Sequence, residues 1–222
     1  MTTSRDQLVR VHNFCISLDG FATGEGQSMD APFGHAGHRL HEWFFETAMT
    51  REQLGLGTGG GRGVDNAMAE AWSPGIGVEI MGRNKFGPQR GPWEDESWRG
   101  WWGENPPFHT PVFVLTHHVR PSVEMEGGTV FHFRDASPQD VLAEAKKAAN
   151  GLDVRIGGGP TVVRDFLAAD LVDLLHVVVV PIVLGRGVRL WDGLEGLDER
   201  FDIETVSSPS GVVHQTFTRK TS

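Results

Sequence analysis

Three consecutive glycines at positions 157–159 stand between an apolar run and an amphipathic run. Glycine has no Cβ, so a ligand can approach its backbone closely, and Pro160, which follows, suits the first turn of a helix. The first turn of a helix offers unpaired N–H groups to an anion. The spacing therefore predicts a phosphate seat between a strand and a helix. A tight strand-to-helix turn without a ligand is the alternative interpretation.

Other phosphate-binding motifs do not fit this chain. Pro160, Thr161 and Val162 follow the glycines where the Rossmann pattern G-x-G-x-x-G requires a final glycine. The chain contains no G-x-x-x-x-G-K-[ST] loop. The predicted seat is therefore of a different kind from either motif.

Two further strands are expected to end in groups that bind anions. The alternation of apolar residues in 76–80 predicts a strand that leads into Gly82, Arg83, Asn84 and Lys85, and 112–115 predicts one that leads into Thr116, His117 and His118. In open α/β sheets, ligands bind beyond the carboxyl ends of the strands. We therefore expect these segments and the glycines to lie at one sheet edge.

Periodicity and turn signals place the remaining elements. A first strand over 8–18 ends at Asp19-Gly20, and Leu174 to Leu184 is almost wholly apolar, although Pro181 implies a bulge or a local edge. Helices are expected over 38–49, 64–72, 138–149 and from Pro160 onward, a strand over 129–133, and a glycine-rich loop over 54–63.

These elements predict an α/β fold. About eight strands and about four helices fit a three-layer arrangement around a mostly parallel central sheet. Segments 201–207 and 211–219 predict an antiparallel C-terminal hairpin. At 222 residues we expect a single domain spanning 1–222.

Composition excludes several classes of function. A formal net charge of -9 without a basic stripe argues against a nucleic-acid partner. The chain has no tyrosine, which excludes reductases that use a tyrosine hydroxyl as proton donor. Cys15 is the single cysteine and is expected to be a buried, inert thiol. No membrane span or signal core is recognised, so the cytoplasm is the expected location.

Four ordered motifs resemble a known family. They are SLDGFAT (17–23), MGRNKFGP (81–88), VFVLTHH (112–118) and IGGGPTVVRDFLAADLVDLLHVVVVPIVLGRGVRLW (156–191). Together they resemble the reductase domain of the riboflavin-biosynthesis deaminase-reductase, within the dihydrofolate reductase superfamily. The resemblance spans nearly the whole chain and implies a dihydrofolate reductase-like fold, NADPH as cofactor and a homodimer.

The resemblance also implies roles for individual residues. Gly158, Gly159, Pro160, Thr161 and Val162 would hold the cofactor pyrophosphate, with Gly157 supporting the turn. Gly82 and Arg83, with Asn84 and Lys85, would receive the adenosine phosphate end, and Thr116 and His117 would flank the 2′-phosphate. The segment that includes Ala22 and Thr23 would pass beneath the nicotinamide.

The chain departs from this family in its catalytic groups. It lacks the H-x-E and P-C-x-x-C motifs of the deaminase half, which excludes zinc deamination here. It also has no clear match to the helix carboxylate that manages a proton in pterin reduction. Asp19, Glu42, Glu46 and His109 are the candidate catalytic residues. Asp19 could instead only form a turn, and the two glutamates could be solvated.

Two further features have a functional and a structural interpretation. The segment 87–111 carries Trp93, Trp98, Trp101 and Trp102, which could stack on a heterocycle or form a hydrophobic lid or dimer contact. A cluster of histidines with Glu42 invites a metal site, but the spacing is not H-E-x-x-H and hydride transfer needs no metal, so no metal is predicted. The histidines concerned are His35, His38 and His41.

These observations lead to one prediction and two alternatives. The prediction is an NADPH-dependent reductase that transfers hydride to a C=N or C=O group of a small heterocycle, an aminopyrimidine or a pterin. The first alternative is a non-catalytic nucleotide-binding or sensor protein on the same fold. The second is a structural dimer with the tryptophan-rich segment as its interface.

Overall fold

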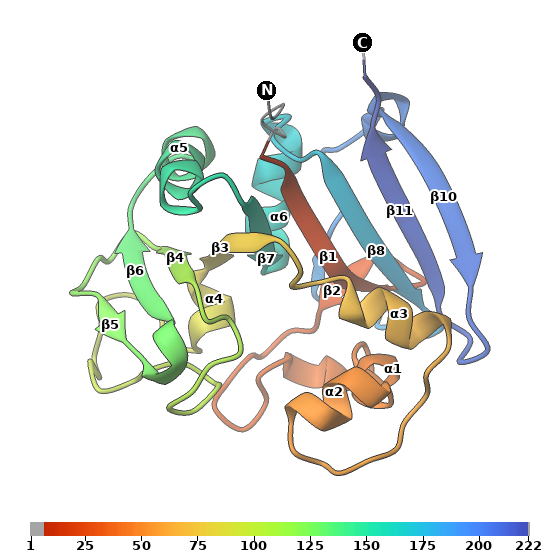
Figure 1. Cartoon of the computed structure of the whole chain (residues 1–222), viewed down its shortest axis with the longest axis horizontal. Coiled ribbons are helices and arrows are strands. Elements are labelled where there is room, and N and C mark those ends of the chain that lie inside the picture. Colours follow the sequence, from red (N-terminus) through yellow and green to blue (C-terminus); the bar gives the residue numbers. More distant parts are fainter. Residues whose placement is uncertain (1–6, 222) are drawn as a thin grey trace. The chain divides into compact units, whose positions relative to one another are not determined.

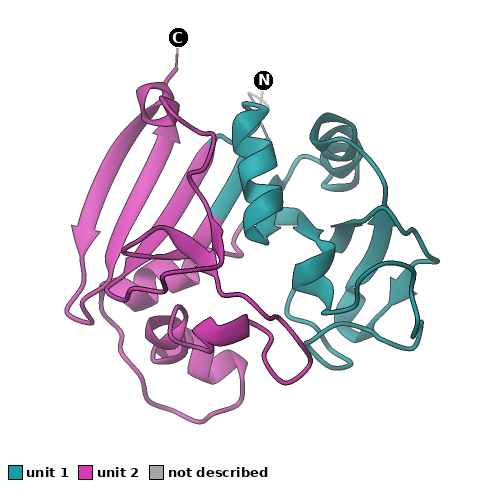
Figure 2. Cartoon of the chain, turned by 180° about the vertical axis from the view of Figure 1, so that it is seen from behind, with its two compact units in different colours: residues 1–11, 75–173 teal, residues 12–74, 174–222 magenta. Residues whose placement is uncertain are grey.

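The computed structural model describes residues 7–221, which form two compact units (Figure 2). Unit 1 comprises the described part of Met1–Val11 together with Gly75–Asp173, and unit 2 comprises His12–Pro74 and the described part of Leu174–Ser222. Strand β1 (Val9–Ser17) contributes its first residues to unit 1 and the others to unit 2. That the chain is one domain stays a prediction.

Unit 1 contains the parallel part of the fold (Figure 1). Its strands follow the order β1, β7 (Asp153–Gly158), β3 (Ile76–Gly82), β4 (Pro111–Leu115), β6 (Val130–Arg134) and β5 (Val123–Glu124), and only the β5–β6 pair is antiparallel. Helices α5 (Pro138–Ala148) and α6 (Pro160–Ala168) pack on β3 and β7, and the short α4 (Arg83–Phe86) follows β3 directly. A 3-10 turn spans Glu126–Gly128.

Unit 2 is mainly antiparallel. Strand β8 (Leu174–Val180) pairs with β11 (Val213–Arg219), which pairs with β10 (Phe201–Ser207) at the sheet edge. Strands β2 (Phe21–Thr23) and β9 (Val188–Arg189) form a separate small sheet. Its other elements are α1 (Glu42–Phe45), α2 (Ala48–Gln53), α3 (Val64–Glu70) and 3-10 turns at Gly34–Ala36 and Leu197–Arg200.

The structure confirms the predicted α/β class, with its mostly parallel strands and C-terminal hairpin, and corrects three details. The described residues form eleven strands and six α-helices rather than about eight and four. The helix predicted over 38–49 is two helices, because Thr47 adopts an extended conformation and its side chain caps α2 by accepting a hydrogen bond from Thr50 N. Strand β8 ends at Val180, immediately before Pro181, whereas the sequence predicted a strand over 174–184 with a bulge or a local edge at Pro181.

Each unit has its own apolar cluster. In unit 1 the cluster includes Phe86, Phe131 and Val112, and in unit 2 it includes Cys15, Leu40 and Trp43. Burial raises the pKa of the Cys15 thiol to about 12, although a hydrogen bond from Trp43 Nε1 partly opposes this effect. Cys15 is therefore an inert core residue, as predicted. No helix within residues 7–221 combines the length and apolar character that crossing a membrane requires.

A chain of hydrogen bonds links four elements of unit 2, which are β1, β8, β11 and α3. Asn13 N donates to His176 Nδ1 at 3.2 Å, His176 Nε2 lies 3.0 Å from His214 Nδ1, and His214 Nε2 lies 2.9 Å from Asp65 Oδ1. Because a backbone N–H can only donate, this order fixes one tautomer: each ring accepts at Nδ1 and donates at Nε2. The His176 imidazole is therefore neutral in the folded chain.

We predict that stability falls between about pH 6.5 and pH 4 because of His176. Burial, and then the neighbouring His214, lower the pKa of His176 to about 4, so the unfolded chain binds its proton first as the pH decreases. The loss should approach about 3 kcal/mol by pH 4. Urea unfolding across this range checks it. His176→Gln should remove most of the dependence, and an equally steep dependence in that variant would contradict the assignment.

Candidate functional site

The three glycines connect β7 to α6 as an open helix start. Gly159 is the N-cap of α6 and contributes no side-chain cap, and Pro160 occupies the first turn. A Cβ added at Gly159 would meet nothing within 4 Å. The peptide bond between Gly158 and Gly159 is cis, and Gly158 has a φ of 113°, which favours glycine. No side chain caps the first N–H groups of α6, and Gly159 leaves open space beside the helix start, so this end is suited to an anion.

Strand pairing brings the predicted anion-binding segments to the same sheet edge. Met81 pairs with Gly158, and Gly82 pairs with Leu115, so α6, α4 and the turn at Thr116 start from neighbouring strand ends. Gly82 also allows α6 to approach, because a Cβ there would lie 2.9 Å from Val162 Cγ2. The predicted juxtaposition of these segments is confirmed.

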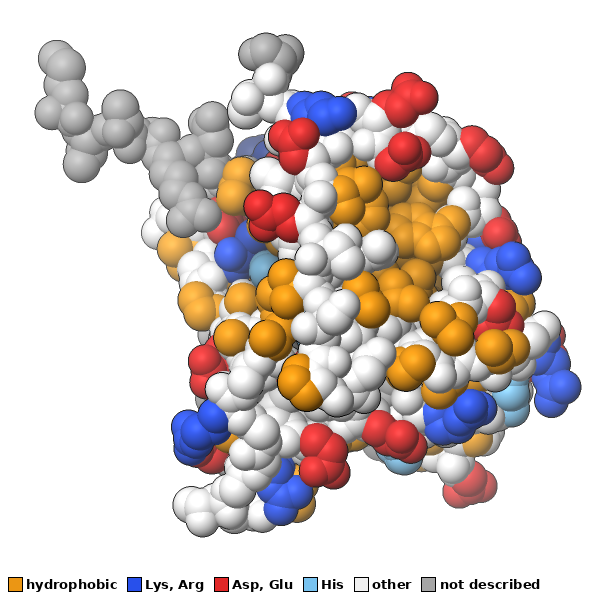
Figure 3. Space-filling view, turned by 90° about the vertical axis from the view of Figure 1, so that its right-hand side faces the viewer, with side chains coloured by type: hydrophobic (Ala, Val, Ile, Leu, Met, Phe, Trp, Pro, Cys, Tyr) orange, Lys and Arg blue, Asp and Glu red, His pale blue; other side chains and the backbone are white. Residues whose placement is uncertain are grey.

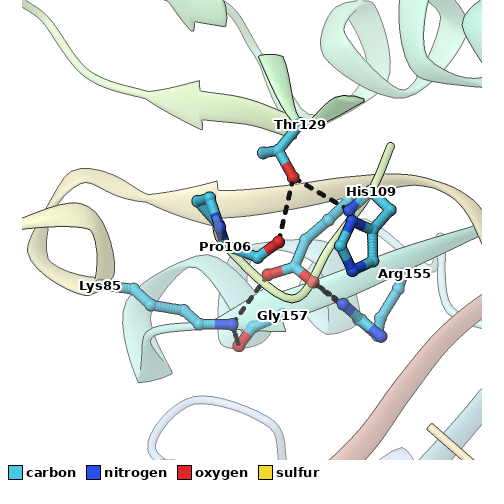
Figure 4. Close-up of polar contacts among 7 residues, drawn as sticks. Lys85, Pro106, His109, Thr129, Arg155 and Gly157 are labelled. Atoms are coloured by element: carbon cyan, nitrogen blue, oxygen red, sulfur yellow. Dashed lines mark hydrogen bonds and ion pairs between the residues drawn. The ribbon is translucent and has the colours of Figure 1, made fainter. Parts of the chain in front are cut away.

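A buried carboxylate lies beneath the glycine turn. Glu79 on β3 is fully buried, and its two oxygens bind Lys85 and Arg155 (Figure 4). Lys85 Nζ is 2.8 Å from Glu79 Oε1, and Arg155 Nε is 2.7 Å from Glu79 Oε2. Lys85 Nζ also donates to the carbonyl of Gly157 at 2.8 Å. This triad of Glu79, Lys85 and Arg155 connects β3, α4 and β7 to the turn.

The triad keeps Glu79 ionised. Burial alone would raise the pKa of Glu79, but Arg155 and Lys85 together hold it below its usual range. Burial lowers the pKa of Lys85, and Glu79 opposes that effect. Lys85 was predicted to receive the adenosine phosphate. In the structure its ammonium group binds Glu79 and the Gly157 carbonyl, which makes it a positioning residue, and its role toward the cofactor stays a prediction.

Arg83, at the start of α4, differs from Lys85 in that two of its donor atoms meet no acceptor among the described residues. It is 9% exposed, and its Nη1 donates to the carbonyl of Gly91. Its Nε and Nη2 are buried and meet no acceptor among the described residues. Burial, and then Arg90, lower the pKa of Arg83. A buried guanidinium with open donors is suited to an anionic ligand.

The remaining residues of this predicted phosphate end lie nearer to solvent. Thr116 Oγ1 accepts from His118 N at 3.1 Å, which forms a tight turn after β4. The His117 side chain is 92% exposed, with Nδ1 2.9 Å from Asp135 Oδ1. Asn84 and Thr161 are exposed. These residues follow β3, β4 and β7 at the same sheet edge.

Asp19 in unit 2 is held by three donors. It accepts hydrogen bonds from Ser17 Oγ at 2.6 Å, Leu184 N at 3.1 Å and Gly185 N at 2.7 Å. The Ser17 hydrogen bond is the main reason that its pKa is lowered to about 2, and the two backbone donors add to the effect. Asp19 is thus ionised at neutral pH and anchors the 184–185 loop, which argues against a role as proton donor. Ala22 and Thr23 lie on β2, where Thr23 pairs with Val188.

Glu42 and Glu46 line one cavity of unit 2. This cavity has a volume of about 550 Å³, and its wall also includes Trp43, Asp65 and Ile182. Both glutamates are exposed at its rim, whereas Asp65 accepts from His214 at the end of the imidazole chain. The sequence pointed to the two glutamates but not to Asp65, which comes from α3.

His109 is held in a structural role. Its backbone N donates to Thr129 Oγ1 (Figure 4). Its Nδ1 lies 2.9 Å from the carbonyl of Gly127. Because a carbonyl only accepts, Nδ1 carries the proton, and the ring fixes the 126–128 turn. His35 is similarly used: its Nδ1 accepts from Glu25 N and its Nε2 faces the Leu184 carbonyl. Within residues 7–221 no group of His, Cys, Asp and Glu is arranged to hold a metal.

The tryptophan-rich segment packs on unit 1. Trp93, Trp98 and Trp102 lie against the apolar cluster that contains Phe86 and Phe131. Trp98 Nε1 donates to the Phe86 carbonyl at 3.0 Å. This packing supports the interpretation of the segment as a hydrophobic cover.

Comparison with known proteins extends these observations. A family model described as the RibD C-terminal domain matches residues 11–211. A protein described as a riboflavin biosynthesis protein from Shewanella sp. PV-4 shares 20% identity and a TM-score of 0.57, over 97% of this chain and 100% of the other. A diaminohydroxyphosphoribosylaminopyrimidine deaminase/5-amino-6-(5-phosphoribosylamino)uracil reductase from Thermotoga maritima shares 15% identity and a TM-score of 0.52, over 96% of this chain and 57% of the other. No curated protein matches.

We predict that Gly157→Ala destabilises the protein, whereas Gly159→Ala does not. A methyl group at Gly157 would overlap Glu79 Oε1 and crowd Lys85 Nζ, whereas Gly159 has open space and a φ of -73° that any residue adopts. The first substitution should cost about 1–3 kcal/mol. Chemical denaturation of both variants checks this, and equal stabilities would contradict the described packing under the turn.

Proposed function

Since the chain belongs to the RibD C-terminal domain family, we propose that it is an NADPH-dependent reductase of a small heterocycle. The acceptor would be a C=N or C=O group of an aminopyrimidine or a pterin. Membership of this family supports an oxidoreductase of small heterocycles. We further propose that the cofactor is NADPH, that the acceptor is one of these groups and that the protein is located in the cytoplasm.

One observation carries the proposal: the residues of unit 1 fit a dinucleotide with an extra phosphate. The open start of α6 offers backbone N–H groups, and Gly159 leaves room beside them. Arg83 offers two buried donors that meet no acceptor in the described chain. A diphosphate and a 2′-phosphate are the two anions of NADPH, and these two features match them in kind.

The residues of the chain would share the work as follows. Gly158, Gly159, Thr161 and Val162 would bind the diphosphate through backbone groups, and Pro160 would fix the helix start. Arg83 would bind the 2′-phosphate, with Thr116 and His117 beside it. Ala22 and Thr23 would receive the nicotinamide end. When bound, NADPH supplies the hydride. The triad under the turn would hold the Gly157 carbonyl in place throughout.

The proton that the acceptor takes up with the hydride would come from a side chain of the protein. Asp19 is ionised and His109 is occupied, so Glu42 and Glu46 are the remaining carboxylates of the predicted set. Both stand at the rim of the 550 Å³ cavity, where a small acceptor could contact them. If neither acts, the non-catalytic nucleotide-binding protein becomes the better account, and the engagement of Asp19 and His109 is the observation that favours it.

We further propose a homodimer through unit 2. Hydrophobic side chains gather on the face that carries β10 and β11 (Figure 3). Strand β10 pairs with β11 on one side and forms the edge of the sheet on the other, and its Ile203 is 43% exposed and Val206 39% exposed. Exposed apolar surface of this kind is typical of interfaces. Sedimentation of the protein would give twice the chain mass of 24.4 kDa, and a monomer would contradict this proposal.

We predict that Arg83→Ala weakens NADPH binding much more than NADH binding, because only NADPH carries the 2′-phosphate. A charge-assisted hydrogen-bonded contact is worth about 1.5–3 kcal/mol, or roughly ten- to a hundredfold in affinity. Isothermal titration with both cofactors measures this. Arg62→Ala, at an exposed arginine of unit 2, is the matched control and should change neither affinity. Equal losses for both cofactors at Arg83 would reject the assigned role.

The catalytic part of the proposal is tested by turnover. The protein should oxidise NADPH, followed by absorbance, in the presence of one member of a panel of aminopyrimidines and pterins. Glu42→Gln or Glu46→Gln should lower kcat by about 10²–10⁴-fold if that carboxylate supplies the proton. Tight NADPH binding without turnover on any acceptor would favour the non-catalytic alternative.

A further inference from the structure

Gly91 and Trp93 contact the guanidinium group of Arg83. Its Nη1 donates to the carbonyl of Gly91, and its guanidinium carbon lies 3.8 Å from the centre of the Trp93 ring. Both contacts come from residues 88–93, which we call the 88–93 segment. The Nε and Nη2 atoms are also buried, although they meet no acceptor in the described chain. Residues of the 88–93 segment thus occupy Nη1 and cover one face of the guanidinium, so an anion that binds all three donors must displace this segment.

Trp93 holds the 88–93 segment in place through two contacts besides that with Arg83. Its Nε1 donates to the carbonyl of His118 at 2.5 Å. A second guanidinium, that of Arg120, lies 4.3 Å from the Trp93 ring. Arg120 also donates to the carbonyls of Glu96 at 3.1 Å and Trp98 at 2.6 Å, so it ties down the chain that follows. Trp93 thus connects the segment to the turn after β4 and stacks with two cations.

In the structure, the acceptor that Arg83 contacts is a neutral carbonyl, that of Gly91. A carbonyl satisfies one of its donors, whereas a phosphate could accept several at once and would carry charge. Replacing the Gly91 carbonyl by a phosphate is favourable for Arg83, but moving the 88–93 segment breaks the contacts of Trp93 with His118 and Arg120. The free energy of opening therefore depends on Trp93 as well as on Arg83.

We propose that the 88–93 segment is a gate over Arg83, and that Trp93 sets how strongly the chain selects a phosphomonoester there. This inference rests on the proposed function, in which that group is the 2′-phosphate of the cofactor. When the gate is open, the Gly91 carbonyl leaves Nη1 and the phosphate binds the three donors. A ligand without this phosphate leaves the gate closed.

The gate has a consequence for affinity. A ligand that binds only the open form has an apparent dissociation constant increased by the inverse of the open fraction. Weakening the closed form therefore tightens binding of the phosphorylated ligand and leaves the other ligand unchanged.

The test uses 2′,5′-ADP and 5′-ADP with the full chain. Trp93→Phe keeps an aromatic ring next to Arg83 but removes the N–H group that binds His118. It should bind 2′,5′-ADP at least about threefold more tightly than the wild type and 5′-ADP with unchanged affinity. In the wild type, 2′,5′-ADP should change tryptophan emission, and this change should disappear in Trp93→Phe. Trp98→Phe, which removes a different N–H group in the same apolar cluster, should behave as the wild type.

Hydrogen exchange supplies a readout that needs no variant. Peptides covering residues 88–93 should exchange faster with saturating 2′,5′-ADP than with saturating 5′-ADP. Unchanged exchange, or an emission change that persists in Trp93→Phe, would overturn the gate while leaving cofactor binding intact. Failure of 2′,5′-ADP, 5′-ADP and NADPH to bind at all would overturn both the gate and the proposed function.

Discussion

The ionised Glu79 beneath the glycine turn is the constraint on which the candidate site depends. A buried carboxylate is stable only when it is paired, and Arg155 and Lys85 pair it from β7 and α4. Because Lys85 also binds the Gly157 carbonyl, the same contacts place the turn. There is no room for a side chain at Gly157, so its glycine is required by the triad rather than by a ligand. Gly159, which borders open space, is the glycine that leaves room for an anion.

Sequence patterns predicted the parts of the fold that depend on local periodicity. The strands before Gly82, Thr116 and Gly157, the helix that starts at Pro160 and the C-terminal hairpin are all present. The helix over 38–49 was wrong as one element, because a helical apolar stripe does not reveal that Thr47 caps a second helix. The strand through Pro181 was too long, because the apolar run continues after the ladder ends.

Contacts between distant residues could not be predicted in the same way. Glu79 lies in an otherwise apolar strand, and that one charged residue was the available signal for the triad. Lys85 was expected to contact the cofactor, and in the structure it binds Glu79. The sequence could not predict this contact, because the position of a cation in the chain does not identify its partner. The cover of Arg83 by Trp93 and the link from Asp65 to His214 join residues 10 and 149 positions apart, and no motif announces them.

The most direct measurement of the central claim is an NMR titration of the full chain with NADPH. If the open start of α6 binds the diphosphate, the backbone amide resonances of Gly159, Thr161 and Val162 should shift strongly and saturate with the same dissociation constant as global binding. Shifts confined to other parts of the chain, with these three amides unchanged at saturation, would contradict the account.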